Sequence, residues 1–449
     1  MRIAGRSALA VWLIIAAASL AWPESPEKLT LTLEDCIQIA LSQNPSYLAV
    51  REREAGAKAM VREAASRFFP SLDLQGSDVL DKKVFVIEFP SFIPGEPPQR
   101  VSVDFTKNYQ FSFNFSLPLF TGGRLISGYK QAGYNLQSTR ETIRQSKQET
   151  VFNIKRAFYS CLLCREMLET AEEAVVLAEK HYANVKNLYD VGMASKFDLL
   201  RSEVAVANLK PQFIRAKNDL SVADLSIKTL LGIDLDRPVE LKGEMVYKAF
   251  EGDIDEAVGR ALQMRPEIGR LKFQKQMAAE MVKIARAEHL PTLALVAGYN
   301  YWSNDFRFTQ NNWESYYSVN LVMTMPLFKG FAVPARVAQS KAALREIEFG
   351  EKALLDAVRF EVNQAVINLE QARETLLSTG KNVEQALEAV RIAELNYAEG
   401  LATNLDVSTA QVALSQARTN YSQALYSCVI SLAQLEKATG TNWGGGESK

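Results

Sequence analysis

Apolar residues recur in steps of three and four along two very long stretches of the chain, residues 122–190 and 330–398. This spacing draws one apolar stripe along an α-helix, and both stretches are rich in residues that favour helices. At about 1.5 Å per residue, each helix is about 100 Å long, so it must pack against other long helices. The stripe of the second stretch consists of Leu354, Val358, Val362, Ala365, Leu369, Ala372 and Leu376.

Four shorter stretches alternate apolar and polar residues instead. They lie at about residues 71–80, 105–117, 292–302 and 316–325. Strict period two predicts β-strands with one apolar and one polar face, and about ten residues suffice to cross a bilayer when a strand is tilted. Residues 81–104 and 303–316, between these strands, are expected to be exposed loops. The clearest alternation places Tyr109, Phe111, Phe113, Phe115 and Leu117 against Gln110, Ser112, Asn114 and Ser116.

Each long helix is followed by a shorter helical stretch, at about residues 195–231 and 403–439. Glycine allows the tight backbone reversal between two helices, and a glycine stands at each of these two reversals. The sequence therefore predicts two long helical hairpins. The tips are Gly192, Met193, Ala194 and Ser195 in the first hairpin and Gly400, Leu401, Ala402 and Thr403 in the second.

The two halves of the chain read as copies of each other. Pro118-Leu119-Phe120 precedes the first long helix and Pro326-Leu327-Phe328 precedes the second, 208 residues later. Upstream of the strands the offset is 221, so the difference in length falls in the first loop. We predict two repeats, residues 22–232 and 254–440, joined by an irregular linker over residues 233–253.

The two ends of the chain are predicted to lie outside this fold. Residues 1–21 combine two arginines, an apolar run and small residues, which is typical of a secretory signal peptide. The apolar run is too short to span a bilayer, and no other run in the sequence is long enough. The tail, residues 441–449, contains three consecutive glycines and is expected to be disordered.

Neither charge nor residue pattern indicates catalysis, a cofactor, a metal site or nucleic-acid binding. The 51 basic and 52 acidic residues balance, which gives no support for a nucleic-acid partner. The two histidines belong to no catalytic or metal-ligand motif, and we expect His181 on a helix surface and His289 at a helix end. Cys161 and Cys164 are expected to be reduced packing residues. The chain is therefore predicted not to be an enzyme.

Four strands cannot close a barrel by themselves. Open strand edges would leave backbone groups without hydrogen bonds in lipid. Several chains are therefore expected to contribute strands to one barrel, with the long helices arranged as a hollow cylinder below it.

This pattern resembles the outer membrane efflux protein family, the TolC-like channels. The resemblance covers essentially the whole mature chain and rests on the duplication, the two Pro-Leu-Phe motifs, Ala157-Phe158-Tyr159 and the two tip segments. It implies an α+β membrane protein: a homotrimer with a 12-stranded outer-membrane β-barrel and a long periplasmic α-helical barrel. The tips would dock on a periplasmic adaptor of a tripartite efflux pump or type I secretion system. A structural trimeric coiled coil on the cell surface is the alternative, but it would need neither the repeated strands nor the hairpins.

The resemblance also implies a gate at the hairpin tips. In the family, the residue matching Asp406 faces the pore, and this chain has Thr409 where better-known members carry a second pore aspartate. It has Ala402 in place of an arginine that helps to hold the hairpins shut. Tyr397 remains, and its hydroxyl would bond Asp198 of a neighbouring hairpin. For Asp198 we favour a helix-dipole role instead, and for Asp406 the pore and helix-dipole interpretations both stay open.

Overall fold

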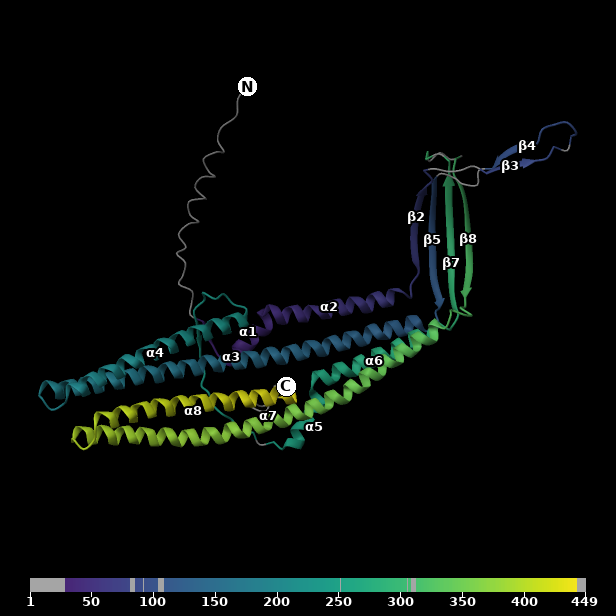
Figure 1. The fold of residues 1–449 in the computed structure, drawn as a ribbon. Coiled ribbons are helices and arrows are strands. Elements are labelled where there is room, and N and C mark those ends of the chain that lie inside the picture. The colour runs from purple at the N-terminus through teal and green to yellow at the C-terminus, as the bar shows by residue number, and fades with distance from the viewer. Residues whose placement is uncertain are drawn as a thin grey trace, which may run out of the picture. The chain divides into compact units, whose positions relative to one another are not determined.

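Eight helices and eight strands make up the described part of the chain (Figure 1). The structure is a computed structural model that describes residues 29–80, 85–91, 93–103, 109–250, 252–304, 306–307 and 312–441. The predicted signal peptide and residues 442–449 of the predicted tail lie outside these ranges. The chain divides into two units. Unit 1 comprises the residues up to Arg51, Thr142–Ile268 and the residues from Leu354 on, and unit 2 comprises Glu52–Glu141 and Gly269–Ala353.

The helices occur in pairs of equal length. Two have 11 residues, two have 22, two have 67 and two have 36. The two longest begin two residues after the expected starts, at Arg124 and Ala332. Equal lengths in the same order support the predicted duplication. The bounds are α1 Leu33–Gln43, α2 Pro45–Ser66, α3 Arg124–Asp190, α4 Lys196–Leu231, α5 Ile254–Met264, α6 Pro266–Ala287, α7 Ala332–Ala398 and α8 Asn404–Thr439.

Four strands form one antiparallel sheet in unit 2. They are β2 (Ser71–Asp78), β5 (Tyr109–Phe120), β7 (Thr292–Ser303) and β8 (Glu314–Thr324), adjacent in that order. The register aligns Leu74, Phe113, Tyr299 and Tyr317 across the sheet, so one face is apolar from edge to edge. The other face is polar, and there the Ser112 hydroxyl donates to Asn300 Oδ1 over 2.7 Å. The apolar face is exposed in the single chain, with Leu72 at 69 % and Leu321 at 64 %.

Two further strand pairs correct the expectations of loop and linker. β3 (Phe85–Phe89) and β4 (Gln99–Val103) form a hairpin inside residues 81–104. β3 carries aromatic and β-branched residues and β4 carries two valines, on either side of a Pro-Gly turn, which favours pairing. β1 (Leu29–Leu31) pairs in parallel with β6 (Val239–Leu241), which lies in the segment expected to be irregular.

Two apolar cores hold unit 1 together. One joins Ile154 and Phe158 of α3 to Ile227 of α4, and the other joins Val358 and Val362 of α7 to Leu435 of α8. Each such buried side chain contributes about 1.5–3 kcal/mol to folding. All four cysteines are free thiols, and burial raises the pKa of Cys36 and of Cys161 to about 12. No described helix combines the length and the apolarity that would be needed to cross a membrane.

Polar side chains join the ends of α4 and α8 to the residues just before α2 and α6. Asn44, just before α2, donates from Nδ2 to the carbonyl of Leu230 at the end of α4 over 2.7 Å. Arg265, just before α6, donates to the carbonyl of Ala438 at the end of α8 over 3.5 Å. Leu230 and Ala438 are 208 residues apart, so the two junctions are equivalent positions of the two halves. Both bonds lie within unit 1, where they fasten the C-terminal ends of α4 and α8.

Candidate functional site

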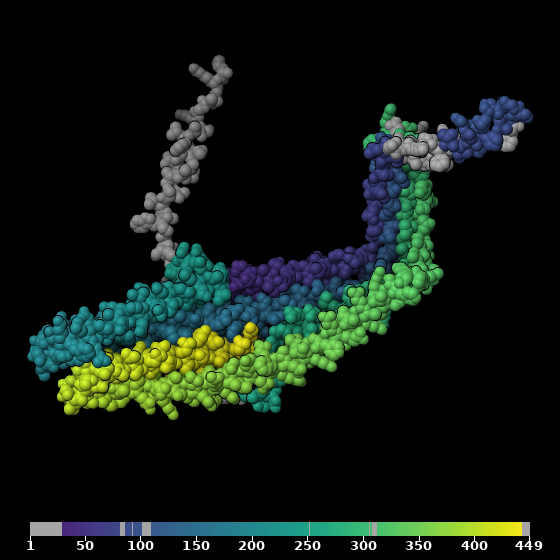
Figure 2. Space-filling view, viewed as in Figure 1, coloured from purple at the N-terminus to yellow at the C-terminus, as the bar shows by residue number. Residues whose placement is uncertain are grey.

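The candidate site is the pair of hairpin tips in unit 1, which lie at the same end of that unit (Figure 2). In the first tip, Met193 N donates to Leu188 O over 2.8 Å and Gly192 has φ +79°. In the second, Leu401 N donates to Asn396 O over 2.7 Å and Gly400 has φ +76°. Both turns thus need a left-handed residue at the same place, which glycine supplies at least cost.

The tips present apolar side chains to solvent. Met193 is 78 % exposed and Leu401 is 75 % exposed. No atom lies within 4 Å of where a Cβ would stand on either tip glycine, so the approach to the turn is open. Exposed apolar side chains beside open backbone are typical of a surface that contacts another protein.

Asp406 and Asp198 each accept a hydrogen bond from the N-cap residue of the helix that follows their tip. Asp406 Oδ2 accepts from the hydroxyl of Thr403 over 2.6 Å and from its backbone N–H over 2.8 Å. These bonds to the Thr403 side chain and backbone hold the pKa of Asp406 below its usual value. Asp198 accepts from the Ser195 hydroxyl over 2.5 Å. Asp406 thus completes a capping box with Thr403, whereas the Asp198 carboxylate bonds only the Ser195 hydroxyl. Asp406 and Thr409 also remain exposed one turn apart on the same side of α8.

A buried polar chain joins the two hairpins just behind the tips. His181 of α3 is only 7 % exposed and Asn404 at the start of α8 only 3 %. The Asn404 amide donates from Nδ2 to the Asp198 carbonyl over 2.9 Å, so its Oδ1 accepts from His181 Nε2 at 2.7 Å. This assigns the Nε2–H tautomer to His181. The expectation that His181 lies on the helix surface is wrong, because the second hairpin covers it.

Tyr397 packs against this chain of bonds. Its ring lies 5.3 Å from the His181 ring at 63°. Burial, followed by the nearby charge of Asp198, raises the pKa of Tyr397. The structure thus brings Tyr397 and Asp198 together within one chain, whereas the hydrogen bond to Asp198 of a neighbouring hairpin stays a prediction.

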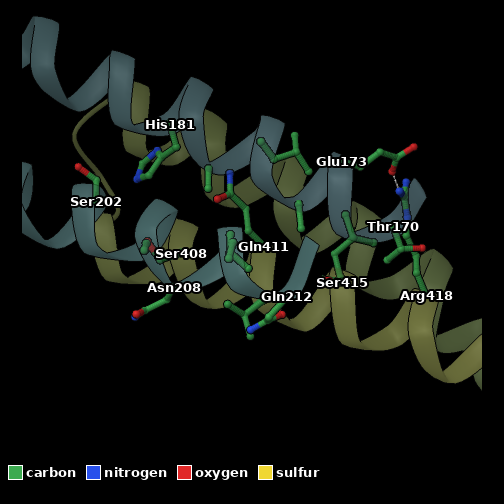
Figure 3. Close-up of a pocket in the computed structure, with 17 residues that line it drawn as sticks. Thr170, Glu173, His181, Ser202, Asn208, Gln212, Ser408, Gln411, Ser415 and Arg418 are labelled. Atoms are coloured by element: carbon green, nitrogen blue, oxygen red, sulfur yellow. Dashed lines mark ion pairs between the residues drawn. The ribbon is translucent and has the colours of Figure 1, made fainter. Parts of the chain in front are cut away.

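A pocket of about 250 Å³ lies between α3, α4 and α8, further from the tips (Figure 3). His181 and Ser202 stand at one end of it, and the ion pair of Glu173 with Arg418 stands at the other. The hairpins are therefore joined by polar contacts at both ends of a space that they do not fill. Sequence reasoning missed both contacts, because neither His181 nor Asn404 belongs to a motif and their separation of 223 residues carries no local signal.

Comparison with solved structures shows that the fold occurs in another protein. The crystal structure of the outer membrane protein VceC from Vibrio cholerae has the same fold, with a TM-score of 0.75 over 92 % of this chain and 96 % of that one, at 19 % identity. Long helical hairpins attached to a β-sheet are thus a fold that this chain shares with VceC.

The chain belongs to the outer membrane efflux protein family, which matches residues 36–233 and 257–441. It is 22 % identical to the outer membrane protein TolC of Vibrio cholerae, over 94 % of this chain and 92 % of TolC. It is 24 % identical to the probable efflux pump outer membrane protein TtgC of Pseudomonas putida, over 92 % of this chain and 83 % of TtgC. The chain is therefore an exit duct in the outer membrane of a Gram-negative bacterium, with its helical part in the periplasm.

Proposed function

We propose that three copies of the chain form one passive export duct, with twelve strands in a closed outer-membrane barrel and the helices in a periplasmic cylinder. The observation that carries this is the four-stranded sheet, whose apolar face is continuous and whose outer strands, β2 and β8, have unpaired edges within the described chain. In lipid such edges need partner strands, and copies related by symmetry supply them. The duct would have no catalytic chemistry of its own.

We further propose that the tips receive a periplasmic adaptor, which links the duct to an inner-membrane pump. The exposed Met193 and Leu401 and the open backbone at Gly192 and Gly400 support this assignment. The cargo follows from the pump: small toxic compounds, metal ions or a secreted protein. Asp406, exposed beside Thr409, would meet its symmetry copies as a ring of carboxylates at the periplasmic end.

Removing the charge of this ring is expected to change ion selectivity. In planar bilayers, Asp406→Asn should reduce the preference for cations and the block by multivalent cations, because three negative charges leave the constriction.

Tyr397→Phe should raise the resting conductance, because the gate loses a hydroxyl. Both variants should run near three times the 50.0 kDa chain mass in detergent, like the parent. Unaltered selectivity and block in Asp406→Asn would leave that residue a helix cap only, and a folded monomer would overturn the trimer.

We expect His181 and Asn404 to hold the closed arrangement of the hairpins. His181→Leu leaves the buried Asn404 oxygen without a donor. We therefore expect a higher resting conductance. We also expect hydrogen exchange over residues 196–208 and 404–411 to become about tenfold faster. His181→Gln keeps a donor and should retain most of the protection. Equal hydrogen-exchange rates in the Leu and Gln variants would show that the bond between His181 and Asn404 does not stabilise the packing of the hairpins.

A further inference from the structure

A strongly basic hollow lies in unit 2, where α6 ends and α7 begins. It measures about 450 Å³ and has Val337 among its apolar walls. Its basic lining is Arg286 in the last turn of α6, His289 just after α6, and Lys341 and Arg345 on α7. No acidic residue is among the described residues that line it. Three permanent cations facing one space repel each other unless an anion joins them.

These cations have no partner among the described residues of the chain. Arg286, Lys341 and Arg345 are exposed and take part in no hydrogen bond or ion pair there. Two nearby carboxylates pair with other cations: Glu288 with Arg336, and Glu351 with Lys275 over 2.8 Å. No ion pair within the described chain therefore neutralises the three cations of the hollow.

The fold itself does not require these residues. At the offsets of 221 and 208, the first half of the chain has Ala65 and Phe68 in place of Arg286 and His289, and Gly133 and Gln137 in place of Lys341 and Arg345. Helices of the same lengths form there without any of the four. The basic set is thus an addition to the second half, which points to a ligand rather than to a structural need.

The position of the hollow along the chain indicates which anion it meets. α6 ends at Ala287, shortly before β7 begins at Thr292, and α7 begins shortly after β8. Between β8 and α7 lie three highly exposed apolar residues: Leu327 at 89 %, Phe328 at 73 % and Phe331 at 75 %. Apolar and aromatic residues followed within a few turns by basic ones are typical of the boundary between acyl chains and headgroups.

We propose that this hollow binds the phosphate of an anionic glycerophospholipid in the periplasmic leaflet of the outer membrane. The proposal rests on the proposed membrane-spanning sheet, which sets the hollow at headgroup level. The other occupant to consider is α2 of a neighbouring copy, next to β8 in the trimer. α2 and the residue after it carry five basic residues against three acidic ones, and Glu54 and Glu63 are paired within their own chain. That helix does not offer the missing negative charge.

The test measures lipid retained by the delipidated full-length trimer in neutral detergent, with native mass spectrometry as the readout. The probes are phosphatidylglycerol, and phosphatidylcholine as the lipid without net charge. Arg286→Gln combined with Arg345→Gln should weaken phosphatidylglycerol binding by about tenfold or more, because each basic group near an anionic lipid contributes about fivefold. The control is Lys272→Gln with Arg373→Gln, which removes two exposed cations of α6 and α7 outside the hollow and should leave binding unchanged.

Several outcomes would overturn the proposal. Equal phosphatidylglycerol affinity in both double variants, or equal retention of the two lipids by the parent, would exclude a headgroup site in the hollow. Competition by inorganic phosphate as strong as that by phosphatidylglycerol would indicate a site for a free anion. Dissociation of the trimer in the Arg286→Gln/Arg345→Gln variant, with lipid binding intact, would assign the cations to a neighbouring copy. Channel conductance of the parent is measured separately, so failure of the duct and failure of the lipid site are distinguishable.

Discussion

Gly192→Trp and Gly400→Trp are each expected to abolish export while the trimer still forms and inserts. A Cβ at either glycine would meet no atom within 4 Å beyond its chain neighbours, so a bulky side chain can extend into the space that a docking partner would use. The left-handed backbone adds about 1–2 kcal/mol of strain in the turn, which is too little to unfold helices of this length. The measurement is survival on a toxic compound to which a strain lacking the protein is sensitive, with blue native electrophoresis of the membranes alongside.

The matched control for the tips is asparagine at the same positions. Asparagine tolerates the left-handed region but remains small, so Gly192→Asn and Gly400→Asn should keep most of the export. Parent-like survival of both tryptophan variants would show that the adaptor contacts another part of the hairpins. Loss of export in the asparagine variants as well would assign the effect to the turn itself.

Arg265→Ala is expected to lower the unfolding free energy of unit 1 by about 3 kcal/mol, among the largest effects of any single change. The Arg265 guanidinium is buried, and it bonds Glu361 Oε2 over 2.5 Å, Glu267 Oε1 over 3.2 Å and the Ala438 carbonyl over 3.5 Å. Its removal leaves a partly buried pair of carboxylates without a cation and loosens the junction of α8 with α6. Thermal unfolding of the detergent-solubilised protein measures the loss.

An exposed ion pair provides the comparison for Arg265. Arg391 bonds Glu388 on the same helix over 2.6 Å, with both side chains more than half exposed. Such pairs contribute less than about 1 kcal/mol, so Arg391→Ala should hardly change the unfolding temperature. If the two variants unfold at the same temperature, Arg265 does not hold the junction together.

Periodicity predicted the long elements because their patterns are regular over many residues. The helices expected over residues 122–190 and 330–398 are Arg124–Asp190 and Ala332–Ala398 in the structure. The C-terminal end of β5 could not be predicted in the same way, because the alternation of apolar and polar residues stops at Pro118. The strand nevertheless continues to Phe120, because Phe120 pairs with Leu293 across a shift of register.

The site was less accessible to sequence reasoning than the fold. Gly192 and Gly400 carry a local signal, because a tight reversal between helices needs a left-handed residue. His181 and Asn404 carry none, since their bond exists only after two hairpins have packed side by side. The basic hollow is hidden for the same reason: Arg286 and Lys341 look like ordinary surface residues until α6 and α7 are placed together.

The pairing of β1 with β6 has a consequence for the order in which the molecule folds. Leu29 lies opposite Val239, so the first described strand finds its partner only in the second half of the chain. Closing a loop of this length costs entropy that three residue pairs alone do not offset, and the pairing must wait for the cores around α3 and α4. Among the elements of the first half, β1 is thus the last to pair, after α3 and α4 have packed into a hairpin. Slow protection of residues 29–31 in pulsed hydrogen exchange would be its kinetic signature.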